Sequence, residues 1–356
     1  MVSPAEGFTI FTVDLLTLFA LYAIIVVSLN LEFGYTGVPN FGKMAAVAAG
    51  GFVAGYVPGH IATWVLAVDP RLDYIADNSK VMAQISQGLS VSPALAIGLF
   101  LGTLIIAALA GSLLGFLTSY PAIRLREDYL AITLLAMAEA VRIVGYNYEP
   151  IAGGTLGVAV ADVFAWIAGP FSDHRYTIIA FVFLGIAAVA LLYSELLARS
   201  PLGRALRAVR DNETAAMSIG KDIVKTRMKV LIVGSALAAI AGALYAFYTV
   251  SVVALTYDRV NWTFIPWVMV IMGGAANNIG ATLGAFVFVA VRKLITFYKH
   301  MLALYIPFNV VWLDTMLVGV VLIIFLLFRP QGLLPEKPTF TLSRERLRRI
   351  ILREKE

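Results

Sequence analysis

The sequence contains no cysteine and few charged residues. Its 356 residues include no cysteine, which excludes a disulfide scaffold, thiolate metal sites and thiol catalysis. Asp, Glu, Lys and Arg make up 14% of the chain, against about 25% in a soluble domain, whereas 60% of the residues are apolar. Such a composition cannot cover a water-facing surface. It therefore predicts a protein embedded in a lipid bilayer.

Motifs for catalysis and nucleotide binding are also missing. No G-x-x-x-x-G-K-[ST] sequence is present to hold a nucleotide phosphate. His60, His174 and His300 stand alone, without the spacing of zinc ligands, and no catalytic serine or carboxylate pair is evident. We therefore expect no enzyme activity, no metal and no cofactor. If ATP drives a process here, the ATPase is a separate chain.

Long apolar segments dominate what remains. A helix needs about 20 mainly apolar residues to cross a bilayer. Segments that meet or approach this length are Leu15–Leu31, Met44–Val68, Val91–Tyr120, Tyr129–Tyr146, Tyr176–Ser194, Val230–Tyr257, Val260–Val291 and Met301–Phe328. The sequence thus predicts an all-α polytopic membrane protein with about eight to ten membrane segments.

The number of segments depends on two interruptions and on the first segment. Met44–Val68 contains Pro58-Gly59, and Val260–Val291 contains Gly273-Gly274 and Asn277-Asn278, so each is one helix or two shorter ones. No Lys or Arg precedes the first apolar stretch, which is too long for a signal peptide. We expect it to be retained as a membrane helix.

Positive charge is concentrated in two stretches. Residues 199–229 carry a net charge of +5 and residues 329–356 carry +4, whereas the rest of the chain sums to −4. Lys and Arg near membrane segments are retained in the cytoplasm. We therefore predict a permease domain over 1–328 with a cytoplasmic loop at 199–229, and a basic cytoplasmic tail at 329–356. Topology explains this charge without nucleic-acid binding.

Breaks in apolar sequence occur in both halves of the chain. The early break contains Gly37, Pro39, Asn40 and Gly42, and the late break contains Gly273, Gly274, Asn277 and Gly280. Non-helical backbone at membrane depth persists where protein or a water-filled cavity satisfies its amides. Paired breaks favour an inverted-repeat transporter whose pathway lies between the repeats. Close helix packing by small residues is the alternative explanation for each glycine.

Charged residues also occur within one apolar segment. Glu139 and Arg142 are three positions apart and share a helix face. Charges inside a membrane segment are costly and are usually paired or functional. We expect a buried structural ion pair, with direct substrate contact as the alternative.

The loop after the fifth of these segments contains a predicted surface helix. Ser200 precedes Pro201 at a helix start, Arg204, Arg207 and Asp211 share one face, and Leu206, Val209 and Glu213 share another. Gly220 is expected to end the run. A short charged helix along the membrane suits docking to a soluble partner, although a basic helix on anionic lipid has the same composition.

Seven pieces of the sequence together resemble one known family. They are GYTGVPNFGKMAAVAAGGFVAG within 30–55, REDYLAITLLAMAEAVRIV at 126–144, AGGTLG at 152–157, SPLGRALRAVRDNETAAMSIG at 200–220, the small residues around 236–246, MGGAANNIGATLGA at 272–285 and FRPQGLLP at 328–335. On these pieces, nearly the whole chain resembles the branched-chain amino acid ABC transporter permeases of the LivM type. The loop and the ending at 328–333 are the most specific parts.

The resemblance implies a set of partners and a coupling site. Members of this family pair with a second, homologous permease subunit, two cytoplasmic ATPase subunits and an extracytoplasmic substrate-binding protein. Residues 203–220 resemble the coupling loop of ABC importers, whose Ala-Ala-x-x-x-Gly core matches Ala215, Ala216 and Gly220. The resemblance thus assigns ATPase coupling to Gly203, Arg204, Arg207, Asp211, Glu213, Ala215, Ala216 and Gly220.

Substrate and energy source leave alternatives open. Leucine, isoleucine and valine are the expected substrates, and import of urea or amides by the same architecture is an alternative. A secondary transporter driven by an ion gradient would show buried carboxylates near the membrane centre, where Glu139 and Asp314 are the candidates. Such a transporter would leave the coupling loop unexplained.

Overall fold

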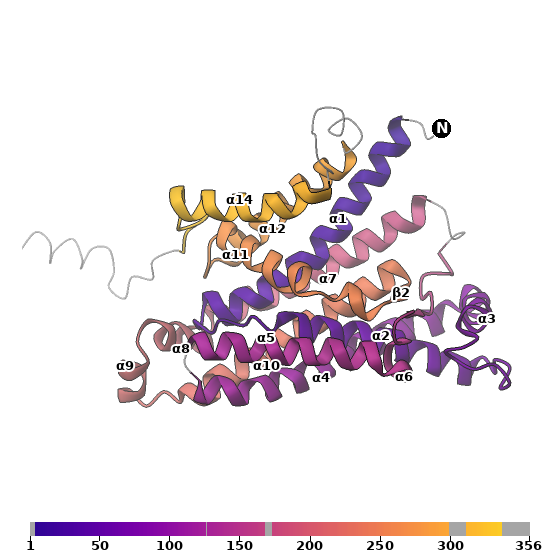
Figure 1. The fold of residues 1–356 in the computed structure, drawn as a ribbon, viewed down its shortest axis with the longest axis horizontal. Helices are drawn as coiled ribbons and strands as arrows, with labels where there is room; N and C mark the ends of the chain where they lie inside the picture. Colours follow the sequence, from indigo (N-terminus) through magenta and orange to yellow (C-terminus); the bar gives the residue numbers. More distant parts are fainter. Residues whose placement is uncertain (1–3, 126, 168–172, 299–310, 337–356) are drawn as a thin grey trace, which may run out of the picture.

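The computed structural model describes residues 4–125, 127–167, 173–298 and 311–336, and these form a helical bundle (Figure 1). Its elements, in chain order, are α1 Pro4–Leu29, η1 Asn30–Gly34, α2 Lys43–Val65, α3 Asn78–Val91, α4 Pro93–Arg124, α5 Glu127–Asn147, α6 Glu149–Ala152, β1 Val158–Ala159, α7 Asp173–Arg199, α8 Pro201–Asp211, α9 Glu213–Ser218, α10 Ile223–Thr249, β2 Ser251–Val252, η2 Ala254–Thr256, η3 Val260–Phe264, α11 Ile265–Gly273, α12 Asn278–Phe297 and α14 Val311–Phe328. The predicted tail beyond residue 336 lies outside the described residues.

Membrane-crossing helices account for most of the bundle. Seven helices in the described part of the chain are long and apolar enough to cross a membrane, namely those at 7–34, 43–65, 93–121, 128–147, 175–199, 223–249 and 278–297. The shorter apolar segment Val260–Gly273 and the 18-residue α14 bring the apolar segments to nine. The predicted all-α polytopic architecture is confirmed, and the count lies within the expected range.

Tight packing at the centre of the bundle depends on small residues. α10 packs along α4 and α2, and these three helices lie side by side with α5 (Figure 1). A Cβ added to Gly50 of α2 would lie 1.8 Å from the carbonyl oxygen of Ala239, and one added to Gly242 of α10 would lie 1.9 Å from that of Val47. At these points the helix backbones touch, which only a hydrogen in place of a side chain permits.

The interruptions in the sequence have different outcomes. Pro58 lies inside the continuous helix α2, so the apolar segment that begins at Met44 is one helix. The segment that begins at Val260 is divided, because α11 ends at Gly273 and α12 begins at Asn278. The stretch 69–90, which separates two of the predicted membrane segments, contains most of helix α3. Four α3 side chains, Val81, Met82, Ile85 and Leu89, recur on one face and are buried.

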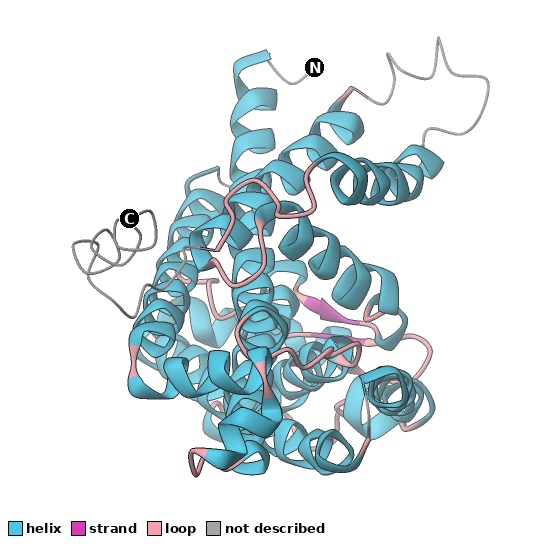
Figure 2. Cartoon of the chain, turned by 90° about the vertical axis from the view of Figure 1, so that its left-hand side faces the viewer, coloured by secondary structure: helices cyan, strands magenta, loops and turns pink. Residues whose placement is uncertain are grey.

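Two short strands join loops far apart in the sequence. β1 pairs antiparallel with β2, with Val158 opposite Val252 and Ala159 opposite Ser251 (Figure 2). The ribbon lies at the end of α10 that is remote from α8, because β2 follows the C-terminus of α10 whereas α8 and α9 precede its N-terminus. The bundle therefore has two distinct ends, which we call the α8 end and the ribbon end.

Candidate functional site

The two predicted breaks meet at the α8 end. Asn30, at the end of α1, accepts a hydrogen bond at its Oδ1 from the backbone N–H of Ala276 over 2.8 Å. The Nδ2 of Asn30 donates to Oδ1 of Asn278 over 2.8 Å, and both side chains are fully buried. A Cβ on Gly34 would lie 2.5 Å from the backbone nitrogen of Ala276. Segments more than 240 residues apart thus form one packed unit.

A buried ion pair holds the early break in shape. Lys43 Nζ lies 2.8 Å from Glu32 Oε1, and neither side chain is exposed. Asn40 Nδ2 donates to Glu32 Oε2 over 2.9 Å, and the indole N–H of Trp267 donates to the carbonyl oxygen of Asn40 over 3.2 Å. Buried charge is costly unless it is paired and hydrogen-bonded, and here both conditions are met. We call Asn30, Glu32, Asn40, Lys43 and Asn278 the turn network.

The predicted pathway residues lie in and around this network. Gly37 has a φ of +76° and faces Arg210, whereas a Cβ on Gly42 would lie 2.7 Å from the carbonyl oxygen of Leu134. Asn40 belongs to the network itself, and the carbonyl oxygen of Pro39 accepts from the N–H of Phe41. The early break is therefore tightly packed against α5 and α8.

The late break packs against the ending of the described chain. A Cβ on Gly274, whose φ is +116°, would lie 2.2 Å from the carbonyl oxygen of Leu334, and one on Gly280 would lie 2.7 Å from that of Gly273. Leu334 N–H donates to the carbonyl oxygen of Gly273 over 3.0 Å, and Asn277 Nδ2 donates to that of Leu334 over 3.2 Å. The ending at 328–335 therefore completes the late break, a role that sequence reasoning missed.

The predicted surface helix consists of two helices. Ser200 caps α8 as expected, accepting hydrogen bonds from the N–H groups of Leu202 and Gly203. The expectation of one helix up to Gly220 is wrong, because Asn212 has extended backbone dihedrals and its side chain caps the new helix α9. Glu213 therefore belongs to α9 and does not share a face with the buried Leu206 and Val209 of α8.

Gly220 lies just beyond α9 and has a left-handed φ of +76°. A glycine there costs nothing in backbone strain, as expected of a residue that ends a helix. The following helix, α10, is capped by Asp222, whose side chain accepts from the N–H of Lys225. This backbone hydrogen bond holds the pKa of the Asp222 carboxyl below its usual value.

Two arginines attach α8 to the rest of the bundle. Arg210 Nη1 donates to the carbonyl oxygen of Gly34 over 2.6 Å, and Arg210 also forms an ion pair with Glu336 at 2.9 Å. Arg207 Nη2 donates to the carbonyl oxygen of Ala198 over 2.8 Å, and its guanidinium lies 5.4 Å from the ring centre of Tyr35. Burial raises the pKa of Tyr35 to about 12, so this ring stays uncharged.

The remaining coupling candidates divide into buried and exposed residues. Gly203 and Ala216 are buried. Arg204, Asp211, Glu213 and Ala215 are exposed, and Glu213 forms an ion pair with Arg227 of α10. The same loop therefore has one face fixed to the bundle and one face open to a partner.

A groove opens beside this loop. It has a volume of about 630 Å³ and is lined by Tyr35, Glu195, Arg199, Arg207, Ala276, Asn277, Ile279, Leu334, Pro335 and Glu336. Glu195 Oε2 at its wall accepts a hydrogen bond from Asn278 Nδ2 over 3.1 Å, which joins the groove to the turn network. Both breaks, α7 and the chain ending thus border one space at the α8 end.

The Glu139 and Arg142 pair forms as predicted but is not fully buried. Arg142 Nε donates to Glu139 Oε1 over 3.0 Å, and each side chain is 24% exposed. Arg259 from the segment before η3 lies 3.7 Å from the other carboxylate oxygen. The pair that sequence reasoning did not find is the fully buried one, Glu32 and Lys43; the signal for it was the two charges flanking the early break.

In the described part of the chain, no group of three or more His, Cys, Asp or Glu side chains could hold a metal ion.

Comparison with known proteins identifies the family. The family model described as the permease component of branched-chain amino acid transport systems matches residues 11–326.

Individual relatives agree with the family model. A protein of Methanocaldococcus jannaschii described as a probable branched-chain amino acid transport permease, LivM, is 39% identical over 93% of this chain and 96% of its own length. The high-affinity branched-chain amino acid transport permease LivM of Escherichia coli is 28% identical over 65% of this chain and 56% of its own length. A LivH permease of M. jannaschii is 29% identical over 48% of this chain and 58% of its own length. No solved structure matches. The chain belongs to the family of permease components of branched-chain amino acid transport systems.

Proposed function

We propose that this chain is one permease subunit of an ATP-driven importer of branched-chain amino acids. The names of its relatives, LivM and LivH, support the substrate class and a second, homologous permease as its partner. The turn network supports a moving part within the chain, because the turn between η1 and α2 and the turn between α11 and α12 are joined there by side chains rather than by continuous helix. The sequence alternatives, import of urea or amides and ion-coupled transport, are less well supported by these relatives.

ATP hydrolysis would act through α8 and α9. The observation that supports this proposal best is the bond from Arg210 of α8 to the carbonyl oxygen of Gly34. It links a helix with an exposed outer face directly to the early break. Two cytoplasmic ATPase subunits would dock on the exposed residues Arg204, Asp211, Glu213 and Ala215, and movement of α8 would displace the turn network.

The α8 end would face the cytoplasm. Residues 199–229 carry an excess of five positive charges, as cytoplasmic loops do. If all nine apolar segments cross, the N-terminus lies outside and the C-terminus inside. The ribbon end would then receive the extracytoplasmic binding protein. The apolar side chains exposed along α4 and α7, among them Leu101, Leu109, Phe181 and Leu192, would contact lipid or the second permease.

Reconstitution tests the energy source. The complex of both permeases and both ATPases, placed in vesicles with loaded binding protein, is expected to take up leucine with ATP and not with a non-hydrolysable analogue. Urea in place of leucine is expected to give no uptake. Leucine uptake by the permeases alone, driven by an ion gradient, would contradict the proposal.

Cysteine labelling tests the orientation, because the chain has no cysteine of its own. Asp211→Cys places a thiol on an exposed side chain at the α8 end, and Leu156→Cys places one on a 90% exposed residue at the ribbon end. In intact cells an impermeant maleimide is expected to label Leu156→Cys and not Asp211→Cys. The reverse pattern would overturn the orientation.

A further inference from the structure

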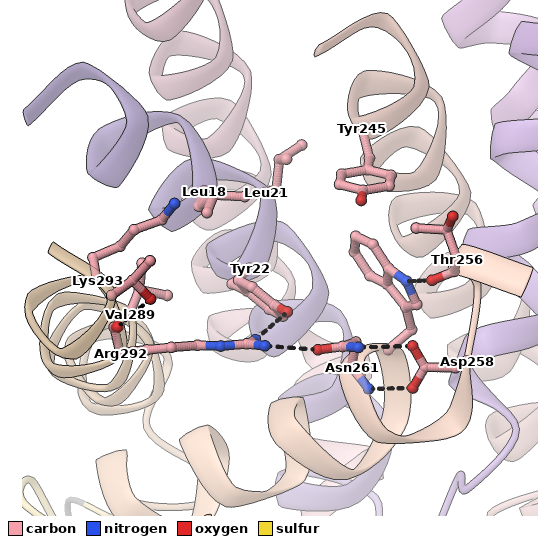
Figure 3. A pocket seen from close by; sticks show the side chains of 12 residues that line it. Leu18, Leu21, Tyr22, Tyr245, Thr256, Asp258, Asn261, Val289, Arg292 and Lys293 are labelled. Carbon is pink, nitrogen blue, oxygen red and sulfur yellow. Dashed lines mark hydrogen bonds between the residues drawn. The ribbon is translucent and has the colours of Figure 1, made fainter. Parts of the chain in front are cut away.

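A cavity of about 370 Å³ lies between α1, α10, α12 and the segment 256–262 from η2 into η3 (Figure 3). Its lining residues are Leu18, Leu21, Tyr22, Tyr245, Thr256, Asp258, Asn261, Trp262, Val289, Arg292, Lys293 and Thr296. Binding sites for small molecules typically measure about 300–1,000 Å³. Arg292 is about 21 Å along α12 from the Asn278 of the turn network. We call this space, toward the ribbon end, the α12 cavity.

Charges of both signs face each other across the α12 cavity. Arg292 extends from α12 and donates to Oδ1 of Asn261 over 3.1 Å, and Asn261 Nδ2 donates in turn to Asp258 Oδ2 over 2.7 Å (Figure 3). Lys293 forms an ion pair with Asp14 of α1. A guanidinium on one wall and a carboxylate on the opposite wall match the two charges of a zwitterion.

The remaining walls are aromatic and aliphatic. The rings of Tyr22 and Trp262 are stacked with centres 5.8 Å apart, and Tyr245 meets Trp262 edge-on at 4.7 Å. Leu18 and Val289 add aliphatic surface. Aromatic faces attract ammonium groups, and aliphatic side chains bind apolar groups by excluding water. The cavity thus offers surface for each part of an apolar amino acid.

We propose that the α12 cavity is an internal binding site for a zwitterionic amino acid with an apolar side chain. Arg292 binds the carboxylate of the amino acid, Asp258 faces its ammonium group, and Leu18 and Val289 contact its side chain. This inference rests on the proposed function, and adds to it that the permease itself, and not the binding protein alone, recognises the substrate.

Two of the contacts of Arg292 are with uncharged groups. Its guanidinium donates to the oxygens of Asn261, at 3.1 Å, and Tyr22, at 3.5 Å. A carboxylate could replace these single contacts by a bidentate pair of hydrogen bonds in which donor and acceptor are both charged. Asp258 already accepts hydrogen bonds from the backbone N–H groups of Val260 and Asn261, and these bonds fix its carboxylate at the cavity wall. A carboxylate has acceptor sites beyond these bonds, so it can also accept from an ammonium group.

Equilibrium binding of radiolabelled L-leucine tests the site. The probe is measured on the assembled permease and ATPase complex in lipid nanodiscs, without the external binding protein. The unsubstituted complex is expected to bind leucine, and to bind leucinamide and 4-methylpentanoate at least tenfold more weakly, because each lacks one of the two charges. Arg292→Gln is expected to weaken leucine binding roughly 10- to 100-fold.

Arg259→Gln is the matched control, since Arg259 belongs to the same end of the molecule but does not line the cavity. Its leucine affinity is expected to stay unchanged. Thr296→Phe, at an exposed lining position, provides a second variant that reduces the volume and is expected to weaken binding even if Arg292→Gln fails to assemble.

The outcomes separate the two proposals. An absence of leucine binding to the unsubstituted complex, or unchanged binding to both Arg292→Gln and Thr296→Phe, would overturn the α12 site while ATP-driven uptake continued to support the proposed function. A complex that binds leucine through Arg292 but shows no ATP-dependent uptake would overturn the proposed function instead.

Discussion

The turn network and the α12 cavity use polar side chains in opposite ways. In the turn network Asn30, Glu32, Lys43 and Asn278 are fully buried and form two pairs, Asn30 with Asn278 and Glu32 with Lys43. In the α12 cavity Asp258 and Arg292 are partly exposed and leave about 370 Å³ between the walls. In the turn network the polar groups bind one another and hold the two breaks together. In the α12 cavity the polar groups line a space large enough for a ligand.

A transport pathway that is never open at both ends needs a seal on one side of the substrate site. In the proposed function the turn network would be that seal, made of paired charges and amides that separate together when it opens. The contact between Arg210 and Gly34 would then link the seal to α8. The following tests break the seal in successively milder ways.

Lys43→Met should have the largest effect. It leaves the Glu32 carboxylate buried without its cation, and removal of one partner of a buried ion pair typically costs about 3–5 kcal/mol. We expect a large loss of folded protein and a lower melting temperature in a size-exclusion thermal assay. Adding Glu32→Gln should restore much of the stability, because no charge is then left unpaired.

The partly exposed pair provides the control for Lys43. Glu139 and Arg142 are each 24% exposed and Arg259 lies 3.7 Å from Glu139, so Arg142→Met should cost less than Lys43→Met. Equal losses in Lys43→Met and Arg142→Met would show that burial of the turn network does not determine its strength. No recovery in the double variant would show that shape, not charge, makes Lys43 necessary.

Sequence reasoning predicted the segments better than their connections. Apolar runs of about 20 residues are local signals, so the helices and the cap at Ser200 could be read from the sequence. The split between α8 and α9 was missed, because the side chain of Asn212 caps a new helix within a run that had the composition of one helix. An Asn can lie within one continuous helix or cap the start of a second one, and the sequence does not show which backbone N–H its side chain binds.

Contacts between distant segments could not be predicted. Glu32 and Lys43 were both visible in the sequence, but nothing local shows that a membrane helix ends between them and returns the chain on itself. Asn30 meets Asn278, and Asn277 meets the carbonyl oxygen of Leu334, only after three segments pack together. The α12 cavity depends in the same way on side chains from α1, α10, α12 and the segment 256–262. Such sites arise from tertiary packing, which no single pattern encodes.

Gly274→Ala should weaken the seal less than Lys43→Met. The added Cβ would lie 2.2 Å from the carbonyl oxygen of Leu334, and the φ of +116° disfavours any side chain. We expect a cost of about 1–3 kcal/mol. The ending at 328–335 should then detach, which limited proteolysis would detect as faster cleavage near Leu334.

Gly98→Ala is the control, because a Cβ at this position of α4 meets nothing within 4 Å.

Assembly and transport should be measured on the same Gly274→Ala and Gly42→Leu samples. Transport that falls in step with assembly indicates a packing role for these glycines. Assembled, ATP-hydrolysing complexes that move no substrate would place them at the pathway.

Arg210→Gln should leave the seal intact but separate it from α8. The arginine donates to the carbonyl oxygen of Gly34 over 2.6 Å, and a hydrogen bond from a charged group contributes about 1.5–3 kcal/mol. We expect normal assembly and a severalfold loss of the ATPase stimulation that loaded binding protein produces. Lys225→Gln, at a 72% exposed lysine of α10, should retain full stimulation. Full stimulation in Arg210→Gln would show that coupling bypasses this contact.

Gly220→Leu should have the smallest effect on stability. A Cβ there meets nothing within 4 Å, so the substitution costs only the left-handed backbone strain at φ +76°, about 1–2 kcal/mol. That cost is too small to unfold the bundle, but it is enough to shift α9, which is six residues long and mostly exposed. Membrane expression should persist while stimulated ATPase activity falls, and Gly220→Asn, which tolerates this conformation better, should fall less. Equal stimulated ATPase activity in the unsubstituted protein, Gly220→Leu and Gly220→Asn would show that the exposed face of α9 does not couple the ATPase subunits to the turn network.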